Sequence, residues 1–98
     1  MKKEYYPIGT VVTLKQAPKV LFMIVGLEVQ SERGECRDYV AVRYPVGEMD
    51  NKNRYFFNCS QIEKVVHMGY VNIDHETYVE LLNCVMEKRR QAGNEEKD

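Results

Sequence analysis

Hydrophobic residues occur in short runs through the first two thirds of the chain and at helical spacing in the last third. The runs are bounded by glycine, proline and polar residues, as is typical of strands in a small antiparallel sheet. We expect strands over residues 10–15, 20–29, 38–44, 54–58 and 64–68. The second strand is apolar on both of its alternating faces, so we expect it to be covered on both sides.

Turn residues separate the expected strands. Pro45 and Gly47 end the third strand, because proline lacks the N–H that a ladder needs and glycine suits a bend. Ser60 is a suitable cap for a single helical turn over residues 60–62, before the fifth strand. This layout predicts an α+β fold, namely a small SH3-like five-stranded antiparallel barrel or bent sheet with one C-terminal helix.

The C-terminal helix is expected to begin with Asp74 as its N-cap. The apolar residues at helical spacing are Tyr78, Leu81, Leu82 and Val85. Basic residues at 88–90 suit the last turn, and Gly93 offers a stop. We therefore expect a single domain over residues 5–92 with a disordered tail over 93–98. The apolar stripe of the helix needs a surface, and the second strand is the expected one.

A chain of 98 residues with 44% hydrophobic and 30% charged residues has the composition of one globular domain. Its net charge of −1 and pI of about 6.1 give no broad attraction to nucleic acid or anionic lipid. The longest apolar run, residues 20–27, is too short for a membrane-spanning helix, so we expect no membrane insertion. The polar N-terminus does not resemble a secretory signal, and three cysteines without a C-x-x-C pair indicate reduced thiols. These features predict a cytoplasmic protein.

Cys59 and His67, with Glu63 as an orienting group, are candidates for a nucleophile and its base. They lie in one short segment, where neighbouring strand positions alternate between faces. A free cysteine beside an aromatic strand usually serves as a small hydrophobic residue, so we expect no enzymatic activity. Three cysteines and two histidines are scattered along the chain without metal-site spacing, so we also expect no metal or other cofactor.

The basic triplet at residues 88–90 is the feature that keeps nucleic-acid binding open as an alternative, since small barrels often bind nucleic acid. Acidic residues flank the triplet, and cations suit the C-terminal end of a helix in any case. No nucleic-acid partner is therefore expected.

The aromatic content indicates a protein partner instead. Tyr55 and Phe57 face one way along the fourth strand and Phe56 faces the other, so at least one ring is expected outside the interior. Either the C-terminal helix covers that ring or it belongs to an exposed patch that binds a protein. The predicted partner-binding residues, in this strand and the loop before it, are Tyr44, Pro45, Gly47, Met49, Tyr55 and Phe57.

Five elements follow one another in a fixed order over roughly residues 6–85. They are P-I-G-T-V-V at 7–12, M-I-V-G at 23–26, D-Y-V…Y-P-V-G at 38–47, F-F-N at 56–58 and I-x-x-V…G-Y at 62–70. In this order they resemble a small family of uncharacterised proteins from Gram-positive bacteria, often encoded near type VII secretion genes and LXG-domain toxins. The segment after Tyr70 departs from that family, because it is less acidic than is usual there.

The resemblance implies a non-enzymatic accessory factor, a chaperone or adaptor, linked to type VII secretion of toxins. Its partner would be another protein, either a toxin or a secretion component. An immunity protein that neutralises a cognate toxin is the alternative, and a nucleic-acid-binding small barrel is a third. The sequence fixes neither the oligomeric state nor the identity of the partner.

Overall fold

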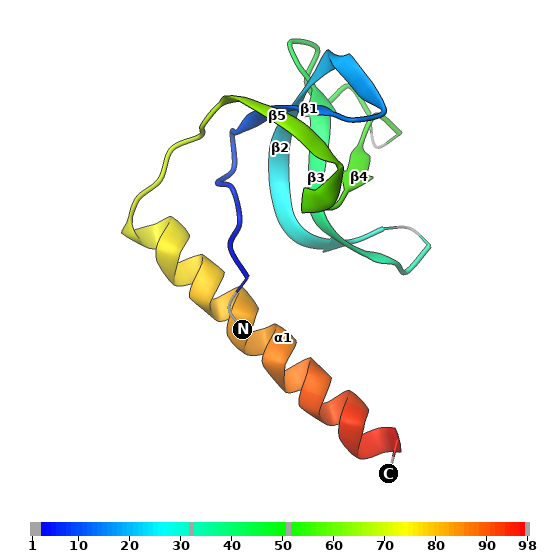
Figure 1. Cartoon of the computed structure of the whole chain (residues 1–98), viewed down its shortest axis with the longest axis vertical. Coiled ribbons are helices and arrows are strands. Elements are labelled where there is room, and N and C mark those ends of the chain that lie inside the picture. Colours follow the sequence, from blue (N-terminus) through cyan, green and yellow to red (C-terminus); the bar gives the residue numbers. More distant parts are fainter. Residues whose placement is uncertain (1–2, 32, 51, 98) are drawn as a thin grey trace. The chain divides into compact units, whose positions relative to one another are not determined.

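The computed structural model describes residues 3–31, 33–50 and 52–97, with side chains up to Arg89. Within these residues, five strands form one antiparallel sheet in the order β4-β3-β2-β1-β5, and one α-helix follows. The elements are β1 (Val11–Leu14), β2 (Ala17–Gln30), β3 (Cys36–Arg43), β4 (Tyr55–Phe57), the 3₁₀ turn η1 (Cys59–Gln61), β5 (Ile62–His67) and α1 (Ile73–Lys97) (Figure 1). The chain forms two compact units: Tyr6–Tyr70 holds the sheet, and Met1–Tyr5 with Val71–Asp98 holds α1.

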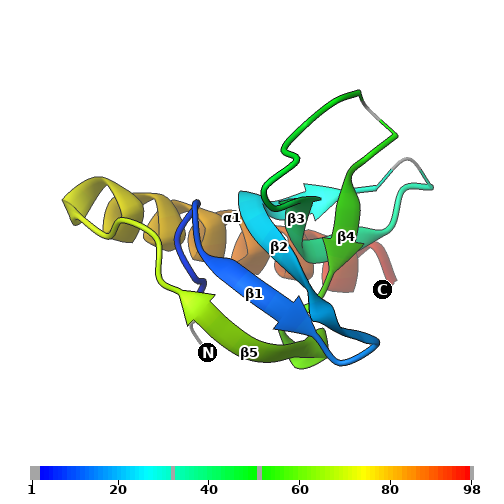
Figure 2. The same ribbon diagram turned by 90° about the horizontal axis from the view of Figure 1, so that it is seen from above.

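The predicted fold class is confirmed: the protein is α+β, with a five-stranded antiparallel sheet among the described residues and a C-terminal helix. Of the two predicted forms, the bent sheet is correct and the closed barrel is not. In the described part of the chain β4 pairs only with β3, and β5 only with β1, so the sheet has two free edges (Figure 2). The 3₁₀ turn ahead of the last strand lies where the SH3-like layout predicts it.

The long strand β2 joins the two halves of the sheet. Residues 17–23 pair with β1 and residues 22–30 pair with β3, so Phe22 and Met23 have a neighbouring strand on both edges. A bulge between Ile24 and Gly26, together with the left-handed backbone of Glu28 (φ 49°), bends the strand just beyond the residues that pair with β1 (Figure 1). The strand begins earlier than predicted, because a tight turn pairs Ala17 with Leu14 and so carries the strand across Pro18.

The core of the sheet unit contains a group of neighbouring aromatic rings among aliphatic side chains. The largest fully buried side chains are Tyr39, Phe57, Ile24, Val12 and Thr10. The Phe57 ring centroid lies 5.7 Å from that of Tyr39 and 6.4 Å from that of Phe22. The Tyr39 hydroxyl accepts a hydrogen bond from the Tyr6 N–H at 3.0 Å, so its polar end is satisfied inside the core. Each such buried ring contributes roughly 1.5–3 kcal/mol, which makes these rings central to stability.

Thr10 and Gly69 connect the start of the sheet unit to its end. The Thr10 hydroxyl donates to the Pro7 carbonyl at 2.7 Å and accepts a hydrogen bond from the Gly69 N–H at 3.0 Å. A Cβ at Gly69 would lie 2.4 Å from the Ile8 carbonyl oxygen and 2.8 Å from the Thr10 nitrogen. Glycine is needed at position 69 because the two backbone segments approach each other this closely.

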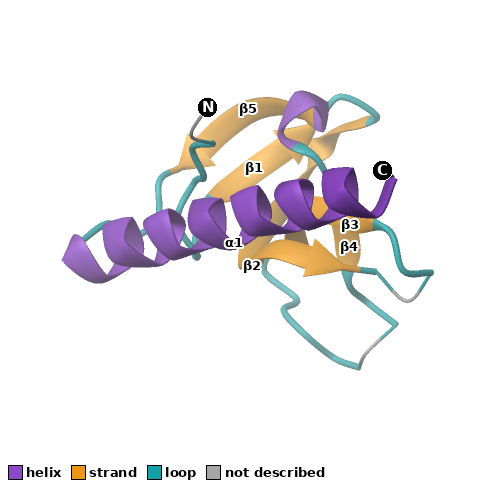
Figure 3. Ribbon diagram, turned by 90° about the horizontal axis from the view of Figure 1, so that it is seen from below, coloured by secondary structure: helices purple, strands orange, loops and turns teal. Residues whose placement is uncertain are grey.

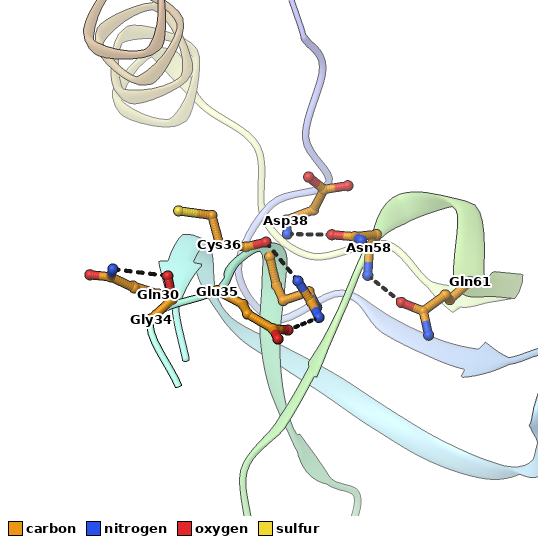
Figure 4. A network of polar contacts seen from close by, with 8 residues as sticks. Gln30, Gly34, Glu35, Cys36, Asp38, Asn58 and Gln61 are labelled. Carbon is orange, nitrogen blue, oxygen red and sulfur yellow. Dashed lines mark hydrogen bonds and ion pairs between the residues drawn. The ribbon is translucent and has the colours of Figure 1, made fainter. Parts of the chain in front are cut away.

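A chain of hydrogen bonds holds the turn after β4 against β3 (Figure 4). The Asp38 N–H donates to Asn58 Oδ1 at 3.1 Å, and the Asn58 N–H donates to Gln61 Oε1 at 2.9 Å. The Asp38 carboxylate accepts a hydrogen bond from the Cys59 N–H at 2.7 Å. The capping residue of η1 is therefore Asn58, and the prediction of Ser60 is wrong, because the turn begins directly after β4.

Helix α1 is one continuous helix (Figure 3). The Asn72 side chain accepts a hydrogen bond from the His75 N–H at 3.2 Å, so Asn72 acts as the cap and Asp74 lies in the first turn. The predicted stop at Gly93 is not seen, since α1 extends to Lys97; one glycine inside a helix costs only about 1 kcal/mol. Arg90 of the predicted basic triplet and Asp98 of the predicted tail lie outside the described side chains.

Candidate protein-binding site

An open groove of about 610 Å³ lies over β2, β3 and β4. We call it the sheet groove. Its apolar lining comes from the three strands: Met23, Val25, Gly26, Val29, Val40, Val42 and Phe56. Its polar lining comes from the end of β2, the β3–β4 loop and the residue before β4: Gln30, Gly47, Glu48 and Arg54. An apolar floor with a few polar groups at its margin is typical of a binding surface.

The strand register builds the floor of the sheet groove. Met23 pairs with Val42 across β2 and β3, and Val40 pairs with Gly26 on one side and with Phe56 on the other. A Cβ at Gly26 would lie 2.6 Å from Val40 Cγ1. The glycine therefore lets the Val40 side chain lie directly against the β2 backbone, which keeps the floor shallow and closely packed.

The β3–β4 loop forms one margin of the sheet groove and is held by its own hydrogen bonds. The Gly47 N–H donates to the Arg43 carbonyl at 2.8 Å, with Gly47 in the left-handed region at φ 76°. The Asp50 carboxylate accepts a hydrogen bond from the Lys52 N–H at 2.8 Å. Arg54 forms an ion pair with Glu48 at 2.5 Å, and both side chains line the groove. These bonds order the described parts of the loop, residues 44–50 and 52–54, and order that exists before binding lowers the entropy cost of binding.

The loop presents apolar side chains to solvent. Tyr44, Val46 and Met49 are all more than half exposed. Gly47 and Glu48, which line the groove, lie between Val46 and Met49 in the sequence. The exposed apolar side chains of the loop are therefore next in sequence to residues that line the groove.

The structure places the predicted partner-binding residues in four different environments. Tyr44, Pro45 and Met49 are exposed on the loop, and Gly47 lines the sheet groove. Tyr55 is partly exposed and packs edge-on against Phe22, with ring centroids 5.1 Å apart.

Phe57 requires a correction. Its side chain is 0% exposed and lies in the core. A ring buried in this way does not reach a partner while the sheet stays folded, so Phe57 is a structural residue.

Sequence reasoning missed the floor of the groove. Phe56 has its ring on the groove side of β4, while Phe57 faces the core. Met23 and Val25 of β2 also line the groove, although that strand was expected to be covered on both faces. Two features of the sequence point to such a surface, namely the alternation of rings in β4 and the apolar residues on both faces of β2. Neither feature shows which face of the sheet is inside.

A second hollow, of about 480 Å³, lies along β4 on the side that carries Tyr55. It is lined by residues in or beside the β1–β2 and β2–β3 turns, by Phe22 of β2, and by residues 54–56. Arg54 and Phe56 line both hollows. The short edge strand β4 thus contributes side chains to two neighbouring depressions in the sheet unit.

The candidate catalytic residues do not form a buried site. Cys59 begins η1 and His67 ends β5, and both are exposed, as is Glu63. Cys59 was expected to serve as a small hydrophobic residue, but the turn after β4 leaves it exposed. Among the described residues, no group of three or more histidines, cysteines and acidic residues is placed to hold a metal ion.

The pKa of one core residue, Tyr39, is clearly shifted. Burial raises the pKa of Tyr39 from 10.0 to about 12, and the hydrogen bond from the Tyr6 backbone acts in the opposite direction. The phenol is therefore neutral at physiological pH. Its place beside Phe57 makes it a structural group.

Fold and surface define a small α+β domain with an open antiparallel sheet and an apolar groove across three of its strands. The family model for a domain of unknown function, DUF4176, matches residues 5–78. The chain belongs to this family, and the matched segment contains the whole sheet groove. Neither the curated proteins nor the solved structures include a match to the chain. Within the described residues, no helix is both long and apolar enough to cross a membrane.

Proposed function

We propose that this domain is a non-enzymatic, cytoplasmic protein-binding factor that receives an apolar segment of a partner in the sheet groove. The observation that carries the proposal is the groove itself, an apolar hollow of about 610 Å³ beside a loop with exposed Tyr44, Val46 and Met49. Contiguous apolar surface of this kind usually marks an interaction site. The resemblance to proteins encoded with type VII secretion genes supports a chaperone or adaptor role, with a toxin or secretion component as the partner.

The groove offers anchors of the type that dominate protein interfaces. Phe56 is half-buried in the floor, and Met49 is a flexible, exposed side chain on the loop. Aromatic and methionine side chains are enriched at interface centres, and Arg54 with Glu48 supplies a polar margin. A few buried anchors of this kind carry most of the affinity of an interface. The partner segment is therefore expected to place apolar side chains against Val25, Val40 and Phe56.

Charge introduced into the floor tests this proposal. Val25 is 38% exposed and lines the groove, whereas Val66 of β5 is 48% exposed and is not among the lining residues. Val25→Lys and Val66→Lys therefore make the same chemical change at similarly exposed strand positions of one unit. Each is expected to change the stability of the domain by less than about 1 kcal/mol, which thermal melts would check.

Tagged wild-type and variant proteins would be used to capture partners from the native cytoplasm at moderate salt, with quantitative mass spectrometry. We expect Val25→Lys to lower recovery of the specific partner at least tenfold, roughly 1.4 kcal/mol or more, while Val66→Lys retains it. Equal recovery by both variants would contradict the proposal.

Two alternative functions, nucleic-acid binding and toxin immunity, would give different results. Capture that collapses with rising salt and yields ribonucleoprotein would assign the sheet to nucleic-acid binding. Protection of cells that express the captured toxin would make the protein an immunity factor, whereas a chaperone or adaptor changes only export of the toxin.

A further inference from the structure

Helix α1 has two different sides that carry apolar residues. On one side, Asn83 accepts a hydrogen bond from the Lys3 N–H at 2.7 Å and donates one to the Lys3 carbonyl at 2.9 Å. The Tyr5 hydroxyl donates to Met86 Sδ on the same side, at 3.3 Å. The segment Lys3–Tyr5 is thus bonded along this side of α1.

The other side of α1 presents an exposed apolar stripe. Tyr78, Leu81 and Val85 are 44%, 56% and 37% exposed. At about 100° per residue these three lie within about 60° of one another, and Asn83 and Met86 lie about 140–160° from Leu81. We call Tyr78, Leu81 and Val85 the helix stripe. An apolar stripe at this spacing is the type of surface that packs against another helix.

The charges at the two ends of the helix stripe are opposite and symmetrically placed. Asp74 precedes Leu81 by seven residues and Lys88 follows it by seven. Both side chains are exposed. Around the helix axis, these two residues and the helix stripe together span an arc of about 80°. Each lies about 10 Å along the axis from Leu81, at 1.5 Å per residue. The surface is therefore acidic at one end, apolar at its centre and basic at the other end.

We propose that the helix stripe is a dimer surface whose occupant is the same stripe of a second copy of this chain, packed antiparallel about Leu81. In this arrangement the two-fold axis passes beside Leu81, and Asp74 of each copy lies level with Lys88 of the other. Two symmetric ion pairs then flank one apolar centre. Such self-complementarity is what a two-fold interface requires of a single patch.

The charge pattern selects this partner and this orientation. Two copies of α1 packed parallel would place Asp74 against Asp74 and Lys88 against Lys88. Like charges that face each other across an interface repel and so disfavour that orientation. The proposal is independent of the sheet groove, since it uses only α1. Leu81, Val85 and Lys88 lie beyond the family match, which ends at residue 78.

The first test is the concentration dependence of molecular mass for the full-length protein. Sedimentation equilibrium in reducing buffer, from roughly 1 µM to 1 mM, covers the weak affinities expected of a small interface. Reducing agent is needed because Cys36, Cys59 and Cys84 are exposed. We expect a monomer–dimer equilibrium, and a monomer at every concentration would overturn the proposal.

Leu81→Lys tests the centre of the stripe, because it places two like charges beside the axis. We expect the dissociation constant to rise at least about tenfold, with circular dichroism unchanged. The matched control is Val66→Lys on β5, which should leave the equilibrium as it is. If Leu81→Lys is instead a monomer with a lower melting temperature than the wild-type monomer, the stripe is packed within a single copy of the chain, and the proposal is wrong.

Charge reversal tests the orientation. Asp74→Lys alters both symmetric ion pairs and should raise the dissociation constant of the dimer about threefold to tenfold. The double variant Asp74→Lys with Lys88→Glu should return the dissociation constant to within about threefold of the wild-type value. Glu76→Lys is the control, since it also removes an acid from the first turn but lies about 140° from Leu81. Failure of the double variant to recover, or an equal effect of Glu76→Lys, would exclude the antiparallel pairing.

Discussion

Adjacent phenylalanines on opposite faces of β4 allow a direct comparison of core and groove. Phe57 is fully buried against Tyr39 and Phe22, whereas Phe56 is half-buried in the lining of the open sheet groove. Truncation of a fully buried phenylalanine to alanine costs about 3–5 kcal/mol, because burial is lost and a cavity remains. At Phe56 water fills the space that the ring leaves, so we expect a loss of only about 1–2 kcal/mol.

These losses are large compared with the total stability of such a chain. A protein of 98 residues has a free energy of unfolding of roughly 5–15 kcal/mol. Phe57→Ala should therefore lower the melting temperature by roughly 15–30 °C, and Phe56→Ala by less than about 10 °C. Urea unfolding followed by circular dichroism would give both free energies. Phe57→Leu, a smaller truncation, serves if the alanine variant does not fold.

Partner binding should depend on Phe56 and not on Phe57, which is the reverse of their order of importance for stability. Phe56→Ala should weaken capture of the specific partner, while Phe57→Leu should bind it normally at temperatures where the variant is folded. Equal losses of stability for the two alanine variants would refute the assignment of one ring to the core and the other to the groove.

Two further predictions concern the core and the closely packed backbone. Burial raises the pKa of Tyr39 to about 12, so the contribution of its neutral phenol to stability is complete below pH 10 and is lost as the pH rises from 10 to 12. Between about pH 9 and pH 11, the free energy of unfolding measured with urea should therefore fall by about 1–2 kcal/mol more for the wild type than for Tyr39→Phe. Parallel pH profiles of the two proteins would contradict this. Gly69→Ala places a Cβ 2.4 Å from the Ile8 carbonyl oxygen, so we expect the free energy of unfolding to fall by roughly 2–3 kcal/mol and the melting temperature to fall with it. A melting temperature equal to that of the wild type would mean that the backbone segments around Ile8 and Gly69 are not this close.

The sequence predicts the strands and the helix of this fold well, because their apolar periodicity is strong. All five predicted strands and the C-terminal helix are present among the described residues. The exact ends are less predictable, since they depend on tertiary contacts. Asn58 caps η1 because Asp38 of β3 holds it there, and the sequence alone does not show this pairing.

The binding surface is harder to predict, because both faces of its strands are apolar. Alternation correctly places Phe56 opposite Phe57, but the core side is decided by how β4 pairs with β3. Tyr39 pairs with Phe57 on the core side, and Val40 pairs with Phe56 on the groove side. A sequence with valine on one face of β3 and tyrosine on the other is compatible with either choice.

Methionine methyl groups provide the most direct measurement of the proposed site. Met23 lines the sheet groove and Met49 lies on its loop, whereas Met68 follows β5 and Met86 lies on α1. We would record methyl NMR spectra of the protein, labelled at its methionines, with and without the partner recovered by capture. We expect the signals of Met23 and Met49 to shift or broaden while those of Met68 and Met86 stay in place. Shifts at Met68 or Met86 without change at Met23 would contradict binding in the sheet groove.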